Sequence, residues 1–347
     1  MDILGFCRRC CKNQSWIIIN QNIKHRLDLL LTGVFIYQKK WNCLMSLIDW
    51  NKLTITEPPV LPRELLRNFK KGIDGAFRDF SRSYGEALEN FFHPLLMFLK
   101  WFQDLLVATP WPIILFVIGA LSWVGSRSWK MSLGAILAFL AIGWMDMWED
   151  TMATLAIVSV ATLLCIAIGI PIGIWMSRSD RVQKIITPVL DVMQTIPSFV
   201  YLIPVVMLLG IGKVPGLLAV MIYASPPIIR LTNLGIRLVD AEVLEAADAF
   251  GSNYRQKLFQ VQIPLALPNI FAGVNQTIMM SLSMVVIAAM IGVPGLGVPV
   301  LRAVSNQYLA LGLMNGLAIV AIAIIFDRVS QAYGKRLQKH REGDHGV

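Results

Sequence analysis

The chain has 347 residues, of which 56% are hydrophobic and only 15% are charged, and its mean hydropathy is +0.61. This composition is too apolar for a soluble domain of that size, and it excludes disordered, collagen-like and disulfide-stapled proteins. The formal charge of +9 does not indicate nucleic-acid binding, because the basic residues lie in the connections between apolar runs rather than on one face beside stacking aromatics. We therefore expect an all-α integral membrane protein.

Residues 1–64 form a poorly defined N-terminal tail. The apolar stretch at 27–37 is short, contains Asp28 and is not followed by a small-residue cleavage site, so it does not resemble a signal peptide. We expect residues 1–44 to be a non-native upstream extension and Met45 to be the true start. Cys7 and Cys10 have the spacing of a metal or redox pair, but no second pair or neighbouring histidine completes a metal site.

Residues 65–104 are predicted to form an amphipathic helix. Apolar side chains recur every third or fourth residue from Leu66 to Leu95, and charged side chains fill the positions between them. Such a helix is too charged to cross a bilayer, so we expect it to lie along the membrane surface or to brace the membrane domain. A solvated helix that packs on a soluble partner is the alternative.

A transmembrane domain is predicted at residues 105–327, followed by a basic tail at 328–347. It contains seven apolar runs, of which the fifth is short, and they cover residues 105–124, 131–147, 151–176, 185–209, 214–229, 268–291 and 309–326. Lys and Arg gather in alternate connections, whereas the acidic residues at 146–150 fall on the other side. Because cytoplasmic loops are rich in Lys and Arg, we expect a cytoplasmic C-terminus and an external N-terminus.

The one long cytoplasmic connection, residues 230–267, is too polar to enter lipid but is patterned as two short helices. Asp240 is expected to cap a helix over residues 241–250, which Gly251 ends with a positive φ. Ser252 is expected to cap a second helix that stops before Pro264. Two short helices of this kind bury little apolar surface, so they need a partner on which to dock.

The same connection resembles the EAA signature of ATP-binding-cassette (ABC) importer permeases. Glu-Ala-Ala is followed after three residues by Gly, and after nine more by an apolar pair and Pro. We call residues 230–267 the EAA loop. The resemblance implies that it couples the chain to an ATPase, with an ordinary glycine-capped loop helix as the alternative. The expected coupling residues are Glu245, Ala246, Ala247, Gly251, Ile263 and Pro264.

A narrower resemblance extends over residues 95–331. Segments at 169–175, 190–204, 226–232, 273–277 and 281–288 are similar to the permeases of glycine betaine and proline betaine importers. The resemblance implies a type I (MetI-like) permease fold in a bacterial inner membrane and a quaternary or methylated amine as cargo. Choline, carnitine and trimethylamine oxide stay open as alternative cargoes.

The resemblance also implies a set of partners. These are a second copy of the chain, two ATPase subunits, a periplasmic or extracellular substrate-binding protein, and membrane lipid. ATP and Mg would bind to the ATPase subunits, so the chain itself would bind no cofactor and no metal and would hydrolyse nothing.

Polar residues within the fourth run are candidates for the translocation pathway. Asp191, Gln194, Thr195 and Ser198 lie three or four apart and would share one helical face. A carboxylate at membrane depth should face a partner or water rather than lipid. Alternatively, Asp191 lies near the cytoplasmic end, where it pairs with Lys184 or caps a turn.

Other residues in the spans have two possible roles each. Tyr201 and Phe199 could hold a cationic cargo through their rings, and Pro197 would bend the span, either as part of a gate or for structural reasons. Asn275 and Gln276 either line the pathway or hold helices together by hydrogen bonds.

Two other classes of protein fit the sequence less well than a permease does. An ion-coupled secondary transporter should show an inverted repeat and paired intramembrane carboxylates, whereas Asp191 stands alone. An intramembrane hydrolase should place a histidine within a span, yet all four histidines lie outside the predicted spans. We therefore expect a non-enzymatic permease subunit, with no catalytic residues.

Overall fold

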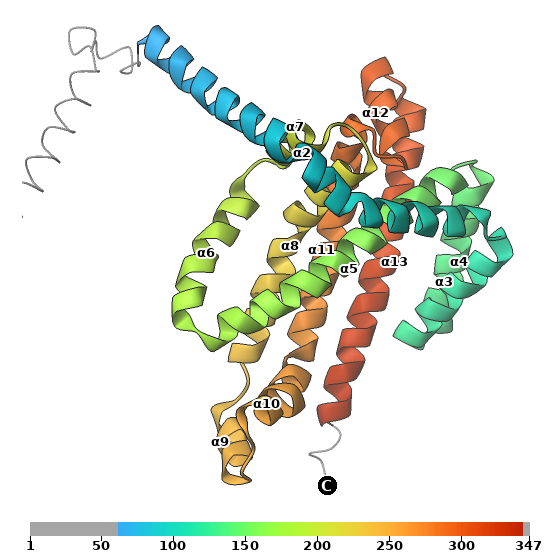
Figure 1. The fold of residues 1–347 in the computed structure, drawn as a ribbon. Helices are drawn as coiled ribbons and strands as arrows, with labels where there is room; N and C mark the ends of the chain where they lie inside the picture. The colour runs from blue at the N-terminus through green and yellow to red at the C-terminus, as the bar shows by residue number, and fades with distance from the viewer. Residues whose placement is uncertain (1–61, 343–347) are drawn as a thin grey trace, which may run out of the picture. The chain divides into compact units, whose positions relative to one another are not determined.

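The computed structural model describes the backbone of residues 62–342 and the side chains of residues 62–334. The predictions for residues 1–61, including the start at Met45 and the cysteine pair, lie outside the described residues. The described residues fall into two units, which divide between Asp79 and Phe80. All regular structure among the described residues is helical (Figure 1), which agrees with the predicted class.

Helix α2, Arg63–Ala108, contains the stretch for which an amphipathic helix was predicted. Within the larger unit, Leu99 of α2 is fully buried. The Ser81 hydroxyl donates a hydrogen bond to the carbonyl of Met207 (2.6 Å), and the Lys213 ammonium donates one to Gln103 Oε1 (2.7 Å). These bonds fasten the second part of α2 to the segment around residues 207–213. A position of α2 at the membrane surface stays a prediction.

The seven predicted apolar runs are all helical, but they do not form seven straight spans. Among the described residues, four helical segments are long and apolar enough to cross a membrane, and the number rises to six if each of two bent helix pairs counts as one span. The four segments belong to α5 (Trp148–Arg178), α8 (Lys213–Arg237), α11 (Ile263–Ala288) and α13 (Leu309–Glu342). By length and composition, four to six of the about seven predicted spans therefore qualify among the described residues.

The remaining runs are bent or short. Helices α2 and α3 (Trp111–Ser126) meet at 106°, and α6 (Asp180–Thr195) and α7 (Ser198–Leu209) meet at 100°. Helix α4, Trp129–Trp144, has 16 residues, which at 1.5 Å per residue gives about 24 Å and falls short of a hydrocarbon core of about 30 Å. Helices α3 and α4 are antiparallel neighbours joined by the Ser132 hydroxyl, which donates to the Gly119 carbonyl (2.7 Å).

Pro197 explains the break between α6 and α7. A proline disfavours helical backbone in the residue before it, and Ile196 is extended, with ψ of 129°. Pro197 itself precedes the first residue of α7, Ser198. The expectation that Ser198 shares a helical face with Asp191 is therefore wrong, because the two residues belong to different helices.

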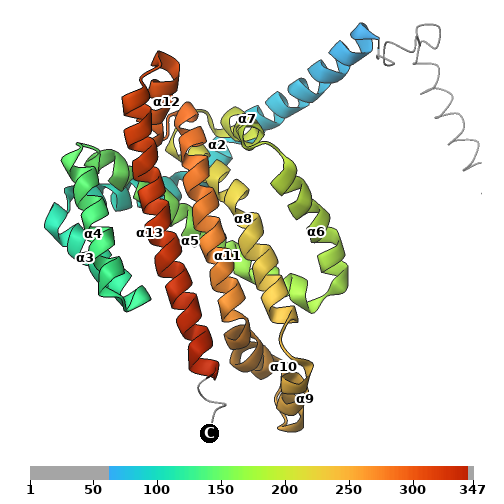
Figure 2. The ribbon, with the colours of Figure 1, turned by 180° about the vertical axis from the view of Figure 1, so that it is seen from behind.

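Helices α5, α8 and α11 pack side by side and form the centre of the larger unit (Figures 1 and 2). Two glycines of α5 permit this packing. A Cβ added at Gly169 would lie 2.5 Å from Ile228 Cγ2, and one added at Gly173 would lie 2.6 Å from Thr232 Cβ. Such distances are shorter than van der Waals contact, so the close approach of α5 and α8 needs glycine at both positions.

The EAA loop begins later than predicted. Helix α8 continues about two turns beyond Ile229 and ends at Arg237. Helix α9 then runs over Ala241–Ala249, followed by α10 (Tyr254–Gln256), the π-helix η3 (Lys257–Gln262) and α11. The short helix η4 (Ala289–Ile291) and helix α12 (Gly297–Asn306) separate α11 from α13.

The first half of the loop agrees with the local signals. The Asp240 side chain accepts a hydrogen bond from the Glu242 amide (3.1 Å), and Gly251 has φ of +75°, so the predicted cap and stop are both confirmed. The second cap is Asn253, which exchanges hydrogen bonds with Gln256 in a capping box, and not Ser252. The hydroxyl of Ser252 donates instead to the Ala247 carbonyl (2.5 Å).

The second helix of the loop does not stop before Pro264. The chain passes through η3, where the Ile263 amide reaches back five residues to the Leu258 carbonyl, and continues directly into α11. Pro264 follows this wider turn directly, in the first turn of α11. A proline has no amide hydrogen to donate and its ring crowds the preceding turn, so the helix accommodates it where the turn is wider.

Candidate functional site

Helix α9 of the EAA loop is exposed along most of its surface. None of its residues, all of which the structure describes, is buried. Glu245 and Ala246 are exposed, Ala247 is half-buried, and Phe250, which directly follows the helix, is 92% exposed. A large apolar side chain that stays in water beside a charged helix is typical of a docking surface.

Helix α9 is nevertheless held in a fixed orientation by local bonds. The Lys257 ammonium contacts both carboxylate oxygens of Asp248, at 2.5 and 2.7 Å, across the turn at Gly251. The Gly251 amide also donates to the Asp248 carbonyl (2.9 Å). A largely exposed ion pair contributes little to stability, but together these bonds fix the angle between α9 and η3.

Asp191 pairs with Arg230. The guanidinium of Arg230 donates a hydrogen bond to Asp191 Oδ1 and so joins α6 to α8. The alternative partner suggested by the sequence, Lys184, is not the one that the structure shows. Arg230 was expected in the loop, but it lies within α8 because this helix is longer than predicted.

The other polar residues of the fourth run differ in their surroundings. Gln194 is exposed, the Thr195 hydroxyl donates within its own helix to the Val192 carbonyl (3.1 Å), and Ser198 begins α7. Tyr201 is only 8% exposed, and its hydroxyl donates to the Met193 carbonyl across the α6–α7 break.

The two candidate aromatic residues therefore differ. The ring of Tyr201 makes an edge contact with Tyr223, at 6.0 Å between ring centroids. Since it is buried in this way, Tyr201 helps to hold the break and does not offer a free face to a cation in this conformation. Phe199 is 54% exposed, and a contact between its ring and the cargo stays a prediction.

Asn275 connects α11 to α13. Its amide donates to Asp327 Oδ1 (2.7 Å), and Gln331 Nε2 donates to the same oxygen (2.7 Å). A cavity of about 370 Å³ lies beside them, lined in part by Gln276 and Ser330. This bonding fits the expectation that polar residues of this run hold helices together. Among the described residues, no hydrogen bond or ion pair joins this set to Asp191, and a pathway role for either set stays a prediction.

Sequence reasoning missed three contacts beside these sites: the Asp191–Arg230 pair, the Asn275–Asp327 bond, and a cation–π contact between Arg178 and Tyr254. Each joins residues that are far apart in the chain, so no local spacing indicates it. In the part of the chain that the structure describes, no group of three or more His, Cys, Asp or Glu residues is arranged to hold a metal ion.

Comparisons with known proteins agree with these features. A family model described as the binding-protein-dependent transport system inner membrane component matches residues 169–339, which include the whole EAA loop. The glycine betaine/proline betaine transport system permease protein ProW of Escherichia coli (strain K12) is 50% identical over 242 residues, which are 70% of this chain and 68% of that protein.

Two further relatives are covered more completely. The glycine betaine/carnitine transport permease protein GbuB of Listeria monocytogenes (serotype 1/2a, strain 10403S) is 47% identical over 68% of this chain and 84% of its own. The glycine betaine transport system permease protein OpuAB of Bacillus subtilis (strain 168) is 43% identical over 78% of this chain and 95% of its own.

Among solved structures, an inward-facing conformation of the MetNI methionine ABC transporter is similar over 53% of this chain and 93% of that chain, with 17% identity and a TM-score of 0.49. The family model, the identity over most of three relatives and the apolar helical fold lead to one conclusion. The chain belongs to the family of inner membrane components of binding-protein-dependent transport systems.

Proposed function

We propose that the chain is the membrane-spanning subunit of an ATP-driven importer of glycine betaine and related quaternary amines. The observation that carries this proposal is the exposed helix α9 at the position of the EAA signature. The names of the three relatives support the cargo, since each contains glycine betaine. Relatives named for trimethylamine N-oxide or for carnitine alone are less similar, at 38% and 31% identity. We keep these cargoes, and choline, as alternatives.

An ATPase subunit is the proposed partner of α9. Phe250 would insert into an apolar cleft of the ATPase, and Glu245 would meet a basic group at its rim. Full burial of a phenylalanine side chain contributes about 1.5–3 kcal/mol, and Phe250 is almost fully exposed in the free chain. ATP and Mg would bind to the ATPase, and this chain would transmit the movement without hydrolysing anything.

A second copy of the chain is the proposed partner of α6 and α7. Among the residues of α6, all of them described, only Leu190 is buried. Many apolar side chains of the two helices are exposed, including Ile185, Val189, Val192, Phe199 and Ile203. Pairing would cover these residues and would enclose a path beside Gln194, Thr195 and Ser198. Two ATPase subunits and an external binding protein would complete the importer.

The EAA loop would lie in the cytoplasm of the bacterial cell, together with the C-terminus. The basic residues at this end of the helices support that orientation, because Arg178, Arg237 and Arg255 all lie beside the loop. The N-terminus would then lie outside, on the side to which a binding protein delivers its cargo.

Copurification and uptake test the proposal together. The tagged chain, expressed with its ATPase, should retain that ATPase and import labelled glycine betaine in proteoliposomes only when ATP is present. Glu245→Arg should reduce both the retention of the ATPase and the import of glycine betaine at least about tenfold. The new positive charge would meet the basic group of the ATPase in the docked surface. Glu149→Arg reverses an exposed carboxylate at the start of α5 and should leave ATPase retention unchanged. Uptake by the chain alone, without any ATPase, would contradict the proposal.

A further inference from the structure

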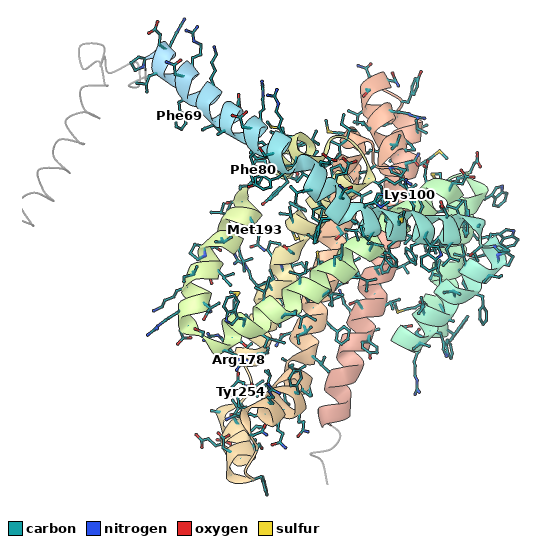
Figure 3. The ribbon with its side chains drawn as sticks, in the orientation of Figure 1. Phe69, Phe80, Lys100, Arg178, Met193 and Tyr254 are labelled. Carbon is teal, nitrogen blue, oxygen red and sulfur yellow. The ribbon has the colours of Figure 1, made fainter. Side chains whose placement is uncertain are left out.

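The corner between α5 and α6 contacts the base of the EAA loop. Arg178, the last residue of α5, lies over the ring of Tyr254 in α10, with its guanidinium carbon 4.1 Å from the ring centroid (Figure 3). This distance is well within the roughly 6 Å at which a cation and an aromatic ring attract one another. The loop is thus attached to a helix that is distant from it in the sequence.

The same corner is also fastened to the end of α8. Arg237 pairs with Asp180 (2.8 Å) and donates to the Met176 carbonyl (3.0 Å). Arg237 is the residue at which the chain leaves α8 to form α9, and Tyr254 is the residue at which it returns. Both ends of the α9 segment therefore contact the α5–α6 corner.

Helix α6 begins at this corner and packs on the core along one side. Leu190 is its single buried residue among the sixteen, all of which the structure describes, and the partly buried Val182, Ile186 and Met193 pack beside it. Its other polar attachment is the Asp191–Arg230 pair. Its far end leads to the α6–α7 break, where Tyr201 bonds to the Met193 carbonyl. Because α6 is continuous from the corner to the break, a displacement of the corner can move the helix and reach the break.

We propose that the Arg178–Tyr254 contact transmits the movement of α9 to α6, so that both are positioning residues for the coupling of ATP hydrolysis to transport. This inference rests on the proposed function. The Lys257–Asp248 bonds link α9 to η3, so a displacement of α9 also displaces Tyr254. Without the contact, the α5–α6 corner would be linked to the α9 segment only at the other end of that segment, through the bonds of Arg237 to Asp180 and to the Met176 carbonyl.

The number of glycine betaine molecules imported per ATP hydrolysed measures this coupling in the reconstituted complex. Tyr254→Leu and Arg178→Leu should each lower it roughly two- to fivefold, which is the range that an exposed cation–π contact supports. Tyr254→Phe keeps the ring and Arg178→Lys keeps the charge, so both should retain most of the coupling. The double variant with two leucines should be no worse than either single variant, because both changes remove the same contact.

Arg181→Leu is the matched control. Arg181 is an exposed arginine in the first turn of α6, three residues from Arg178, and its loss should leave the coupling unchanged. The bound ATPase should be retained in every variant.

Three outcomes would overturn the inference while leaving the proposed function intact. The first is wild-type import per ATP in Tyr254→Leu with the ATPase still bound. The second is loss of the ATPase from Tyr254→Leu, which would place Tyr254 in the docking surface instead. The third is an equal defect in Tyr254→Phe and Tyr254→Leu, because the ring would then not be the functional group. Absence of an ATPase from the wild-type complex would instead contradict the proposed function itself.

Discussion

Replacement of Gly173 by alanine tests the close packing of α5 against α8. The new Cβ would lie 2.6 Å from Thr232 Cβ and 2.8 Å from the carbonyl oxygen of Ile229. A carbonyl within α8 cannot turn aside without losing its helical hydrogen bond, so the two helices must separate. Overpacking of this kind costs about 1–3 kcal/mol. We take the upper end, because backbone is contacted, and subtract about 1 kcal/mol for the higher helix propensity of alanine. The net destabilisation is about 2 kcal/mol.

Thermal unfolding of the purified protein in detergent measures this effect. A loss of about 2 kcal/mol should lower Tm by about 4–8 °C, at roughly 2–4 °C per kcal/mol for a large domain. Gly316→Ala is the matched control, because Gly316 lies within α13 and a Cβ there would meet nothing within 4 Å. Its Tm should be unchanged or slightly higher. A Tm of Gly173→Ala at or above that of the wild type would refute the requirement for glycine at this crossing.

Two further predictions concern the ion pair and the docking surface. Asp191→Ala should reduce uptake several-fold while lowering Tm by less than about 4 °C, because the pair is partly exposed and contributes at most about 1 kcal/mol. Lys184→Ala should change neither, and an equal loss of uptake in the two variants would argue against the pair seen here. Phe250→Ala should leave Tm unchanged but weaken ATPase binding at least about tenfold in a pull-down titration, as truncation of a buried anchor residue does. Unaltered binding would show that Phe250 lies outside the interface.

The first half of the EAA loop could be predicted because its signals are local. Asp240 and Gly251 act on the backbone within a few residues of themselves, so their roles follow from residue type and position. The second half contained a local signal that was overlooked, since Asn253 and Gln256 have the spacing of a capping box. The π-helix that follows could not be predicted, because one wider turn leaves the apolar periodicity almost unchanged.

Contacts between helices that are distant in the chain could not be predicted from the sequence. Asp191 was correctly recognised as a carboxylate that needs a partner, but the choice of Arg230 over Lys184 depends on how far α8 extends and how α6 lies against it. The break at Pro197 was expected as a bend. Its angle of 100° depends on packing around Tyr201, and that angle removes Ser198 from the face on which it was placed.

The separation of α9 from the interior of the chain has an evolutionary consequence. No side chain of this helix, which the structure describes completely, is buried. Substitutions on its surface can therefore accumulate without repacking the helices behind it. Under the proposed function, the choice of ATPase would then diverge independently of the choice of cargo, so that one type of ATPase would come to serve permeases of different specificity.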